Sequence, residues 1–230
     1  AVTGYTTTVN DQINIYTTTT ARHNGTAASG YKLYPASTGA DQNTLSIASN
    51  YITINGLILS ADVGHSYYNI FRVTASYLTI KNNIITTTNK ASSGVNIDSG
   101  GNLYFYNNII FGILAGFGAS GRALEDANWN YGTSFYYNNT LYNNGIGFSI
   151  AVGNGGNKTL KNNICIGTTP DYTISENGAG TIPRSNNISL DATADGDGSL
   201  TGKTAENQFV NTASDLHLKV GADAIDAEQV

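Results

Sequence analysis

The feature that most constrains the fold is a short phrase that recurs about every two dozen residues. In it, two adjacent asparagines separate a short β-branched or aromatic run from a second apolar run, as in "LTIKNNIITTT". A first copy without the asparagines has Gly56 and Leu57 in their place. Counted from Gly56, the steps between the six copies are 26, 25, 31, 24 and 24 residues. A period of this length predicts stacked structural repeats. The copies with paired asparagines lie at 78–88, 104–112, 135–143, 160–167 and 184–190.

The second asparagine of each pair aligns with Leu57 in the first copy. Because a leucine at this position favours the interior, we expect the asparagines to face inward as well. Amides stacked on one another can donate to and accept from neighbouring repeats, which would satisfy them inside a tight turn. A solvated Asn-Asn turn without such a ladder is the alternative. The predicted ladder consists of Asn83, Asn108, Asn139, Asn163 and Asn187.

A second column of apolar residues shares the period and predicts another strand in each repeat. It reads Ile47, Val73, Ile97, Leu124, Ile150 and Ile174. Strands this short cannot bury a face alone, so they must stack as the coils of a solenoid. The sequence therefore predicts an all-β parallel β-solenoid of about six or seven coils of roughly 24–26 residues, with capped ends. We expect one domain, with an N-terminal cap and entry strands at 1–40, regular coils at 41–190 and a C-terminal cap at 191–230.

Composition narrows the class of partner. Only 12% of residues are charged, the net charge is −5, and the 11 lysines and arginines are scattered. This composition disfavours nucleic-acid binding, and no apolar run approaches the roughly 18 residues that a membrane span needs. The single cysteine, Cys165, lies in an apolar column and is expected to be buried. The three histidines are far apart, so we expect no metal site; "DGDG" at 195–198 leaves Ca²⁺ as an alternative to a glycine-rich turn.

With these columns in place, residues 40–190 resemble the right-handed parallel β-helix proteins of the pectate-lyase-like superfamily. The stretch "NQFVNTASDLHLKVGADAIDA" at 207–227 is similar to the tail of the bacterial and viral β-helix proteins called choice-of-anchor Q, in which a phrase of the type "FVNP…DFHL…GSPAIDAG" closes the helix. The resemblance implies a secreted or virion component. It also implies that any enzyme on this fold would be a polysaccharide lyase, using Ca²⁺ or basic residues, or a hydrolase using clustered carboxylates.

Either chemistry requires charged residues on adjacent coils, because the substrate lies across them. The candidates are Asp98 and Glu125, each of which follows an apolar-column residue, with Asp126 beside them and Arg72 one coil earlier. Ordinary solvated turn charges are the alternative interpretation. No lyase or hydrolase signature matches residue by residue, so no catalytic residue is carried over.

Aromatic residues indicate a binding surface more strongly. Tyr106 and Tyr137 precede two of the asparagine pairs at positions expected to face outward. The repeat with the 31-residue step carries extra residues, which include Arg122, Trp129 and Tyr131. Such rings can stack on sugars or form the centre of a protein interface. Tyrosines packed against one another in shallow surface stacks are the alternative interpretation.

The sequence thus predicts a non-catalytic extracellular or virion-surface module with a structural, decoration or adhesion role. Its expected partners are carbohydrate or other protein chains of a surface assembly, and a homo-oligomer such as a trimer would suit that use. A polysaccharide lyase or glycosidase is the first alternative, and a purely architectural spacer is the second. No cofactor is expected unless Ca²⁺ binds.

Overall fold

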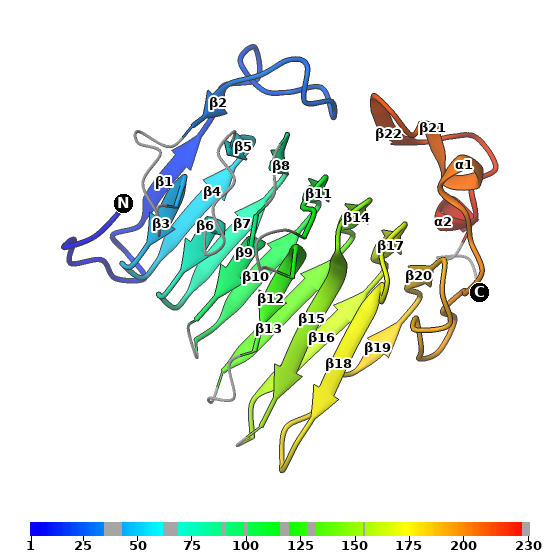
Figure 1. Cartoon of the computed structure of the whole chain (residues 1–230). Helices are drawn as coiled ribbons and strands as arrows, with labels where there is room; N and C mark the ends of the chain where they lie inside the picture. Colours follow the sequence, from blue (N-terminus) through cyan, green and yellow to red (C-terminus); the bar gives the residue numbers. More distant parts are fainter. Residues whose placement is uncertain are drawn as a thin grey trace.

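The computed structural model describes residues 1–34, 43–61, 69–88, 91–98, 101–115, 120–127, 132–153 and 155–226. In these ranges the chain winds through three parallel sheets, which we name A, B and C (Figure 1). Sheet A contains β3 (Leu45–Ile47), β6 (Asn69–Val73), β9 (Ser93–Ile97), β12 (Arg122–Asp126), β15 (Ile146–Val152) and β18 (Tyr172–Glu176). Sheet B contains β1 (Ile13–Tyr16), β4 (Ile52–Asn55), β7 (Leu78–Lys81), β10 (Leu103–Tyr106), β13 (Thr133–Tyr137), β16 (Asn157–Lys161) and β19 (Arg184–Ser185).

Sheet C contains β2 (Lys32–Leu33), β5 (Ile58–Ala61), β8 (Ile84–Thr87), β11 (Ile109–Phe111), β14 (Thr140–Tyr142), β17 (Ile164–Ile166) and β20 (Ile188–Ser189). The chain passes from A to B to C and then starts the next coil, so each strand pairs with the strand three positions further along the chain. The fold class predicted from the repeat is confirmed. The solenoid makes about 5 turns, slightly fewer than the six or seven coils predicted.

The corner between sheets B and C explains the paired asparagines. The first asparagine of each pair adopts the left-handed conformation, with φ between 53° and 57°, and Gly56 takes its place in the first copy at φ 82°. Asparagine enters this region more readily than most residues, because its short polar side chain bonds locally. The second asparagine then points inward and is at most 2% exposed at all five positions.

The inward columns of the three sheets form one hydrophobic core, dominated by isoleucine, leucine and phenylalanine. One part of the predicted apolar column is wrong. Leu124 pairs with Val95, so the residue that continues the column from Ile97 to Ile150 is Asp126. An interior aspartate therefore replaces the expected apolar residue in that coil.

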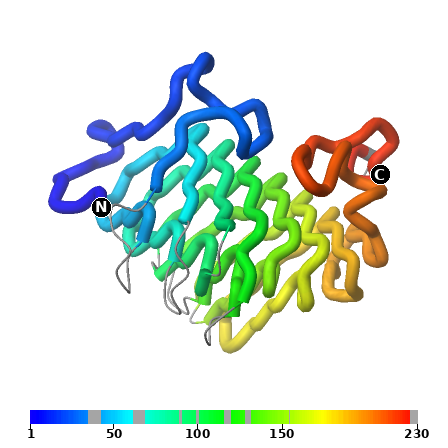
Figure 2. The backbone as a smooth tube through the Cα atoms, turned by 45° about the horizontal axis from the view of Figure 1, so that its top comes forward, coloured from blue at the N-terminus to red at the C-terminus, as the bar shows by residue number. Residues whose placement is uncertain are grey.

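The outer face of sheet C is also apolar, and it is covered at both ends. Ile58 and Ile84 lie beneath the N-terminal segment 17–34, while Ile164 and Ile188 pack under the C-terminal part of the chain. That part contains α1 (Ala205–Gln208), β21 (Phe209–Asn211), β22 (Asp215–Leu218) and α2 (Asp223–Asp226). In two views the N-terminal and C-terminal segments lie on the same side of the solenoid (Figures 1 and 2).

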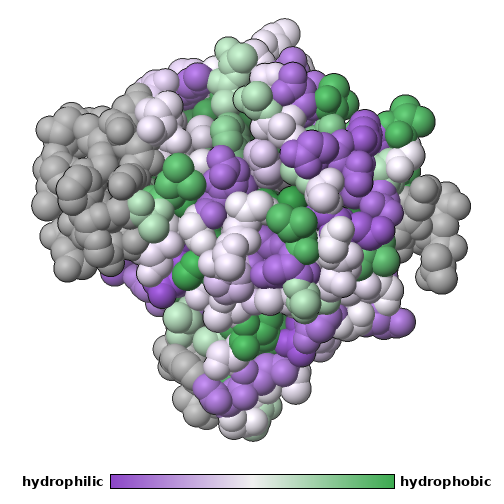
Figure 3. Space-filling view, turned by 45° about the vertical axis from the view of Figure 1, so that its right-hand side comes forward, coloured by the Kyte–Doolittle hydropathy of each residue, from purple (hydrophilic) through white to green (hydrophobic). Residues whose placement is uncertain are grey.

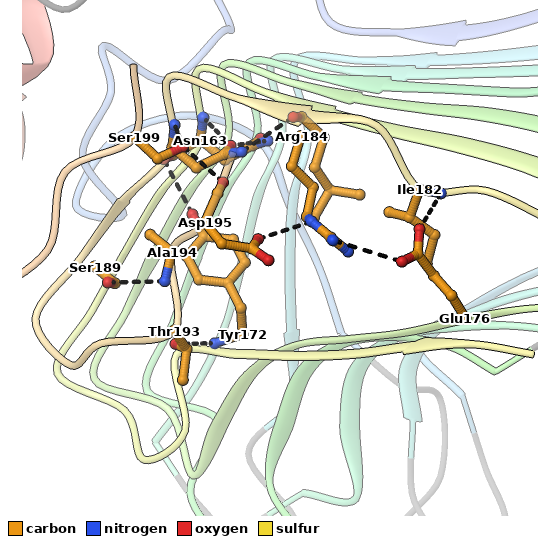
Figure 4. Close-up of polar contacts among 12 residues, drawn as sticks. Asn163, Tyr172, Glu176, Ile182, Arg184, Ser189, Thr193, Ala194, Asp195 and Ser199 are labelled. Atoms are coloured by element: carbon orange, nitrogen blue, oxygen red, sulfur yellow. Dashed lines mark hydrogen bonds and ion pairs between the residues drawn. The ribbon is translucent and has the colours of Figure 1, made fainter. Parts of the chain in front are cut away.

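The loop 191–200 lies against the last coil (Figure 4). Arg184 occupies the inward column after Leu160 and forms ion pairs with Asp195 at 2.7 Å and Glu176 at 3.5 Å. The hydroxyl of Ser199 accepts from the backbone N–H of Asn187, which provides the last asparagine with a partner. When the C-terminal end of the solenoid is turned forward, hydrophobic side chains are seen scattered among polar ones (Figure 3).

Candidate functional site

Four aromatic side chains gather on the outer face of sheet B, on the neighbouring strands β10 and β13. Tyr104 lies opposite Phe135 and Tyr106 lies opposite Tyr137. The rings of Tyr104 and Phe135 stack with centroids 4.9 Å apart and planes 19° apart. Phe135 and Tyr137 are tilted at a centroid distance of 5.6 Å. We call these four residues the aromatic strip.

Strand alternation decides which aromatic residues form the strip. Successive side chains of a strand point to opposite faces, so Phe105 and Tyr136 enter the core, where both are 0% exposed. Tyr104 remains 48% exposed, whereas Tyr106, Phe135 and Tyr137 are partly buried by one another and by their neighbours. Partial burial raises the pKa of the Tyr137 phenol, although its hydrogen bond with Thr159 opposes this effect. The strip is therefore accessible, and its backbone is fixed by the parallel ladder on both sides.

A lysine flanks the strip on each side. Lys81 pairs with Tyr106, and Lys161 pairs with Tyr137, so the four residues form one outward column. The Lys81 ammonium lies 5.7 Å from the Tyr106 ring centroid. Within the described part of the chain, neither lysine takes part in an ion pair. The strip thus combines apolar ring faces with phenol groups and two available ammonium groups.

The sequence anticipates half of this strip. Tyr106 and Tyr137 lie in it as outward neighbours, but Tyr104, Phe135, Lys81 and Lys161 were not among the predicted ligand-binding residues. Tyr104 and Phe135 lie two positions before the predicted tyrosines on the same strands, and the two lysines are in register with those tyrosines on the neighbouring strands. The two-residue period of a strand, applied to neighbouring coils, is the signal that could have found them.

The other three predicted ligand-binding residues do not extend the strip. Arg122 lies on sheet A, where its guanidinium contacts Glu125 at 3.0 Å. Trp129 and Tyr131 lie outside the described residues.

The predicted catalytic residues divide into separate pairs. Arg72 and Asp98 form an exposed ion pair at 2.9 Å. Glu125 pairs with Arg122 and accepts from the Ser93 hydroxyl at 2.9 Å. The strands β9 and β12 are neighbours, but Glu125 pairs with Asn96, which lies two residues before Asp98. The two carboxylates lie in different columns and have different arginine partners.

Asp126 belongs to the interior, contrary to its predicted place beside Asp98 and Glu125. It is 1% exposed and binds the ammonium group of Lys158 at 2.7 Å, while the phenol of Tyr136 donates to its other oxygen. Burial lowers the pKa of Lys158, and Asp126 opposes that shift. Burial and the Asp126 charge raise the pKa of Tyr136 well above its usual value. This buried group belongs to the core and is out of reach of a polymeric substrate.

The Asp-Gly-Asp-Gly stretch contacts other residues of the chain. Asp195 pairs with Arg184, and the backbone at Asp197 bridges to Ser185 at the end of sheet B. Across the residues that the structure describes, no group of three or more His, Cys, Asp or Glu side chains is placed to hold a metal ion. None of the described helices is long and apolar enough to cross a membrane.

No protein-family model, no curated protein and no solved structure matches the chain. The solenoid fold and the aromatic strip are therefore the basis for any statement about function.

Proposed function

We propose that this chain is a non-catalytic β-helix module of an extracellular or virion surface, and that it binds carbohydrate through the aromatic strip. The finer resemblance to choice-of-anchor Q proteins of the pectate-lyase-like superfamily is part of the same proposal. The observation that carries it is the stacking of Tyr104 on Phe135 beside the outward pair Tyr106 and Tyr137. A strip of this kind offers flat apolar faces to sugar rings and phenol groups to their hydroxyls.

The solenoid supports binding because it holds the rings in place before a ligand arrives. Neighbouring strands of a sheet lie about 4.8 Å apart, so rings on β10 and β13 form a continuous platform. Both strands are paired on each side within sheet B, which reduces the ordering cost of binding. Lys81 and Lys161 are placed to donate to sugar oxygens at either side of the platform.

The sheet A residues support a lyase or glycosidase less well. General acid–base catalysis requires groups that are available at one point of the substrate. Asp98 and Glu125 instead lie in different columns, and each pairs with its own arginine. Burial of Asp126 removes the third carboxylate from the same face.

A glycan array with wild-type protein and the double variant Tyr104→Ala/Tyr106→Ala tests the proposal. Tyr16→Ala is the matched control, because Tyr16 is an exposed tyrosine in the same outward column, at β1, where its next neighbour is Asn55. We expect the double variant to weaken binding at least tenfold, about 1.4 kcal/mol, and Tyr16→Ala to leave it unchanged. Equal binding by all three proteins would contradict a role for the strip.

Reducing-sugar and unsaturated-uronate assays, with and without Ca²⁺, run beside the array. We expect no product from any glycan that binds. Product formation that Glu125→Gln or Asp98→Asn abolishes would replace the binding proposal with the enzymatic one. Absence of both binding and product would favour an architectural role among other protein chains.

A further inference from the structure

The N-terminal segment and the C-terminal hairpin meet above the outer face of sheet C. His217 of β22 packs so closely on Gly25 that a Cβ atom at position 25 would collide with its ring, and Gly25 has φ 93°. Figures 1 and 2 show these two parts of the chain approaching each other over the middle coils. We call residues 25–28 and 212–217 the arch.

A cavity of about 1050 Å³ lies beneath the arch. Its floor includes Phe111 and Tyr142, which are paired neighbours on β11 and β14. The arch side contributes the hydroxyl-bearing residues Thr26, Thr212 and Ser214 together with Leu216. The cavity is separate from the aromatic strip, which belongs to sheet B.

The cavity marks the place where the chain stops covering an apolar sheet face. Toward the two ends of the outer face of sheet C, Ile84 and Ile188 are at most 1% exposed, because the terminal segments pack over them. Between those ends Phe111 and Tyr142, which line the cavity, are only half-buried. The uncovered stretch retains aromatic and aliphatic side chains but is bounded by polar residues of the arch.

The lining indicates the chemical class of the ligand. Among the described residues that line the cavity, none carries a charged side chain. Against these described residues, a charged ligand group would lose water without gaining an ion pair, which is costly. An uncharged ligand with both apolar faces and hydroxyl groups would match the ring floor and the hydroxyl-bearing walls. The cavity volume of about 1050 Å³ is slightly above the roughly 300–1,000 Å³ typical of ligand pockets.

We propose that the cavity beneath the arch is a second binding site, which takes a short neutral oligosaccharide. It differs from the aromatic strip in that no lysine is among its described lining residues and in that it is bordered by two segments distant in sequence. The site does not depend on the strip, so either could bind without the other.

Isothermal titration calorimetry with neutral probes tests the site, using cellobiose, chitobiose and maltotriose. Ser214→Trp places a bulky ring in the cavity from an exposed hairpin position, and Phe111→Ala removes part of the floor. Val210→Trp is the control, because Val210 is 58% exposed on β21 and does not line the cavity. Thermal unfolding verifies that each variant folds, and Ser214→Trp suffices alone if Phe111→Ala does not.

We expect at least one neutral probe to bind wild-type protein, and Ser214→Trp to weaken it at least tenfold. Val210→Trp and the strip variant Tyr104→Ala/Tyr106→Ala should bind that probe as wild type does. Absence of binding by all three probes would overturn the proposal. Binding that survives Ser214→Trp but is lost in the strip variant would also overturn it, while leaving the proposed function intact.

Discussion

Asn139 donates from its side-chain amide to Oδ1 of Asn163, 24 residues later, at 3.0 Å, and its backbone N–H reaches the same oxygen at 3.0 Å. Its own Oδ1 accepts the equivalent two bonds from Asn108. Its second amide hydrogen is donated to the carbonyl of Phe105 at 2.9 Å. Every polar atom of this buried side chain therefore has a partner on a neighbouring coil.

Replacing Asn139 with alanine should destabilise the solenoid strongly. The change leaves the backbone N–H and one amide hydrogen of Asn108 without their acceptor inside the core. Because an unsatisfied buried group costs about 1–3 kcal/mol, we expect the free energy of unfolding to fall by roughly 2–5 kcal/mol. Chemical denaturation measures the change.

Asn138→Gly is the matched control for that variant. Asn138 has φ 54° and Gly56 fills the corresponding position in the first copy. Since glycine adopts this conformation without strain, we expect a change of less than about 1 kcal/mol. Equal destabilisation by the two variants would mean that the ladder contributes nothing beyond the turn.

The buried pair of Asp126 and Lys158 should behave as a unit. Lys158→Met leaves an uncompensated carboxylate inside the coil, so we expect a loss of about 3–5 kcal/mol. The double variant Asp126→Leu/Lys158→Met removes both charges and should recover at least half of that loss. A double-mutant cycle in urea measures the coupling; additive effects of the two single changes would contradict it.

The N-terminal segment should make stability depend on pH through His23. Its Nε2 donates to the carbonyl of Asn82 at 2.8 Å, and its Nδ1 accepts from the backbone N–H of Gly25, so the ring fits this site in its neutral form. Burial lowers the pKa of His23 below its usual 6.5, and the charge of Arg22 adds to this. As pH falls through 6.5, the unfolded chain takes up the proton first, so stability declines until the pH is below the folded pKa.

The measurement is the urea midpoint of wild type and of His23→Gln between pH 7.5 and 5. We expect the wild type to lose more stability over this range than the variant does. Parallel curves for the two proteins would show that His23 does not produce the dependence.

Cys165 should resist thiol reagents as long as the solenoid is folded. Its side chain is 0% exposed, and burial raises the pKa of the thiol well above its usual value. Since the thiolate is the reactive form, we expect labelling at pH 8 to proceed at the rate of unfolding. Fast labelling in buffer, with urea-unfolded protein as the reference, would contradict this burial.

The repeat made the fold predictable because successive coils turn the corner between sheets B and C in the same way. An asparagine pair, one residue in the left-handed region and one inside, leaves a mark in the sequence that no ordinary turn repeats five times. The error at Leu124 has a physical cause. An interior aspartate is rare, and its compensating lysine lies 32 residues further along the chain, so choosing the nearest apolar residue gave the wrong column.

The surfaces were less predictable than the core. The sequence groups Asp98 with Glu125 because each follows a residue of the predicted apolar column. Since Leu124 does not belong to that column, Glu125 pairs with Asn96 and not with Asp98. The arch depends on contact between Gly25 and His217, which belong to no repeat and follow no period. Side-chain alternation could have placed Tyr104 and Phe135, because the strand that carries each was already evident.

The asparagine ladder also has a direction. Each amide oxygen accepts from the preceding coil, and each asparagine backbone N–H donates to the following one, from the Leu57 backbone N–H at one end to the Ser199 hydroxyl at the other. Only these two ends are special, and every coil between them presents the same pair of connections. Duplication or deletion of a whole coil would leave no amide of the ladder orphaned, so the ladder itself accommodates a change in the number of repeats.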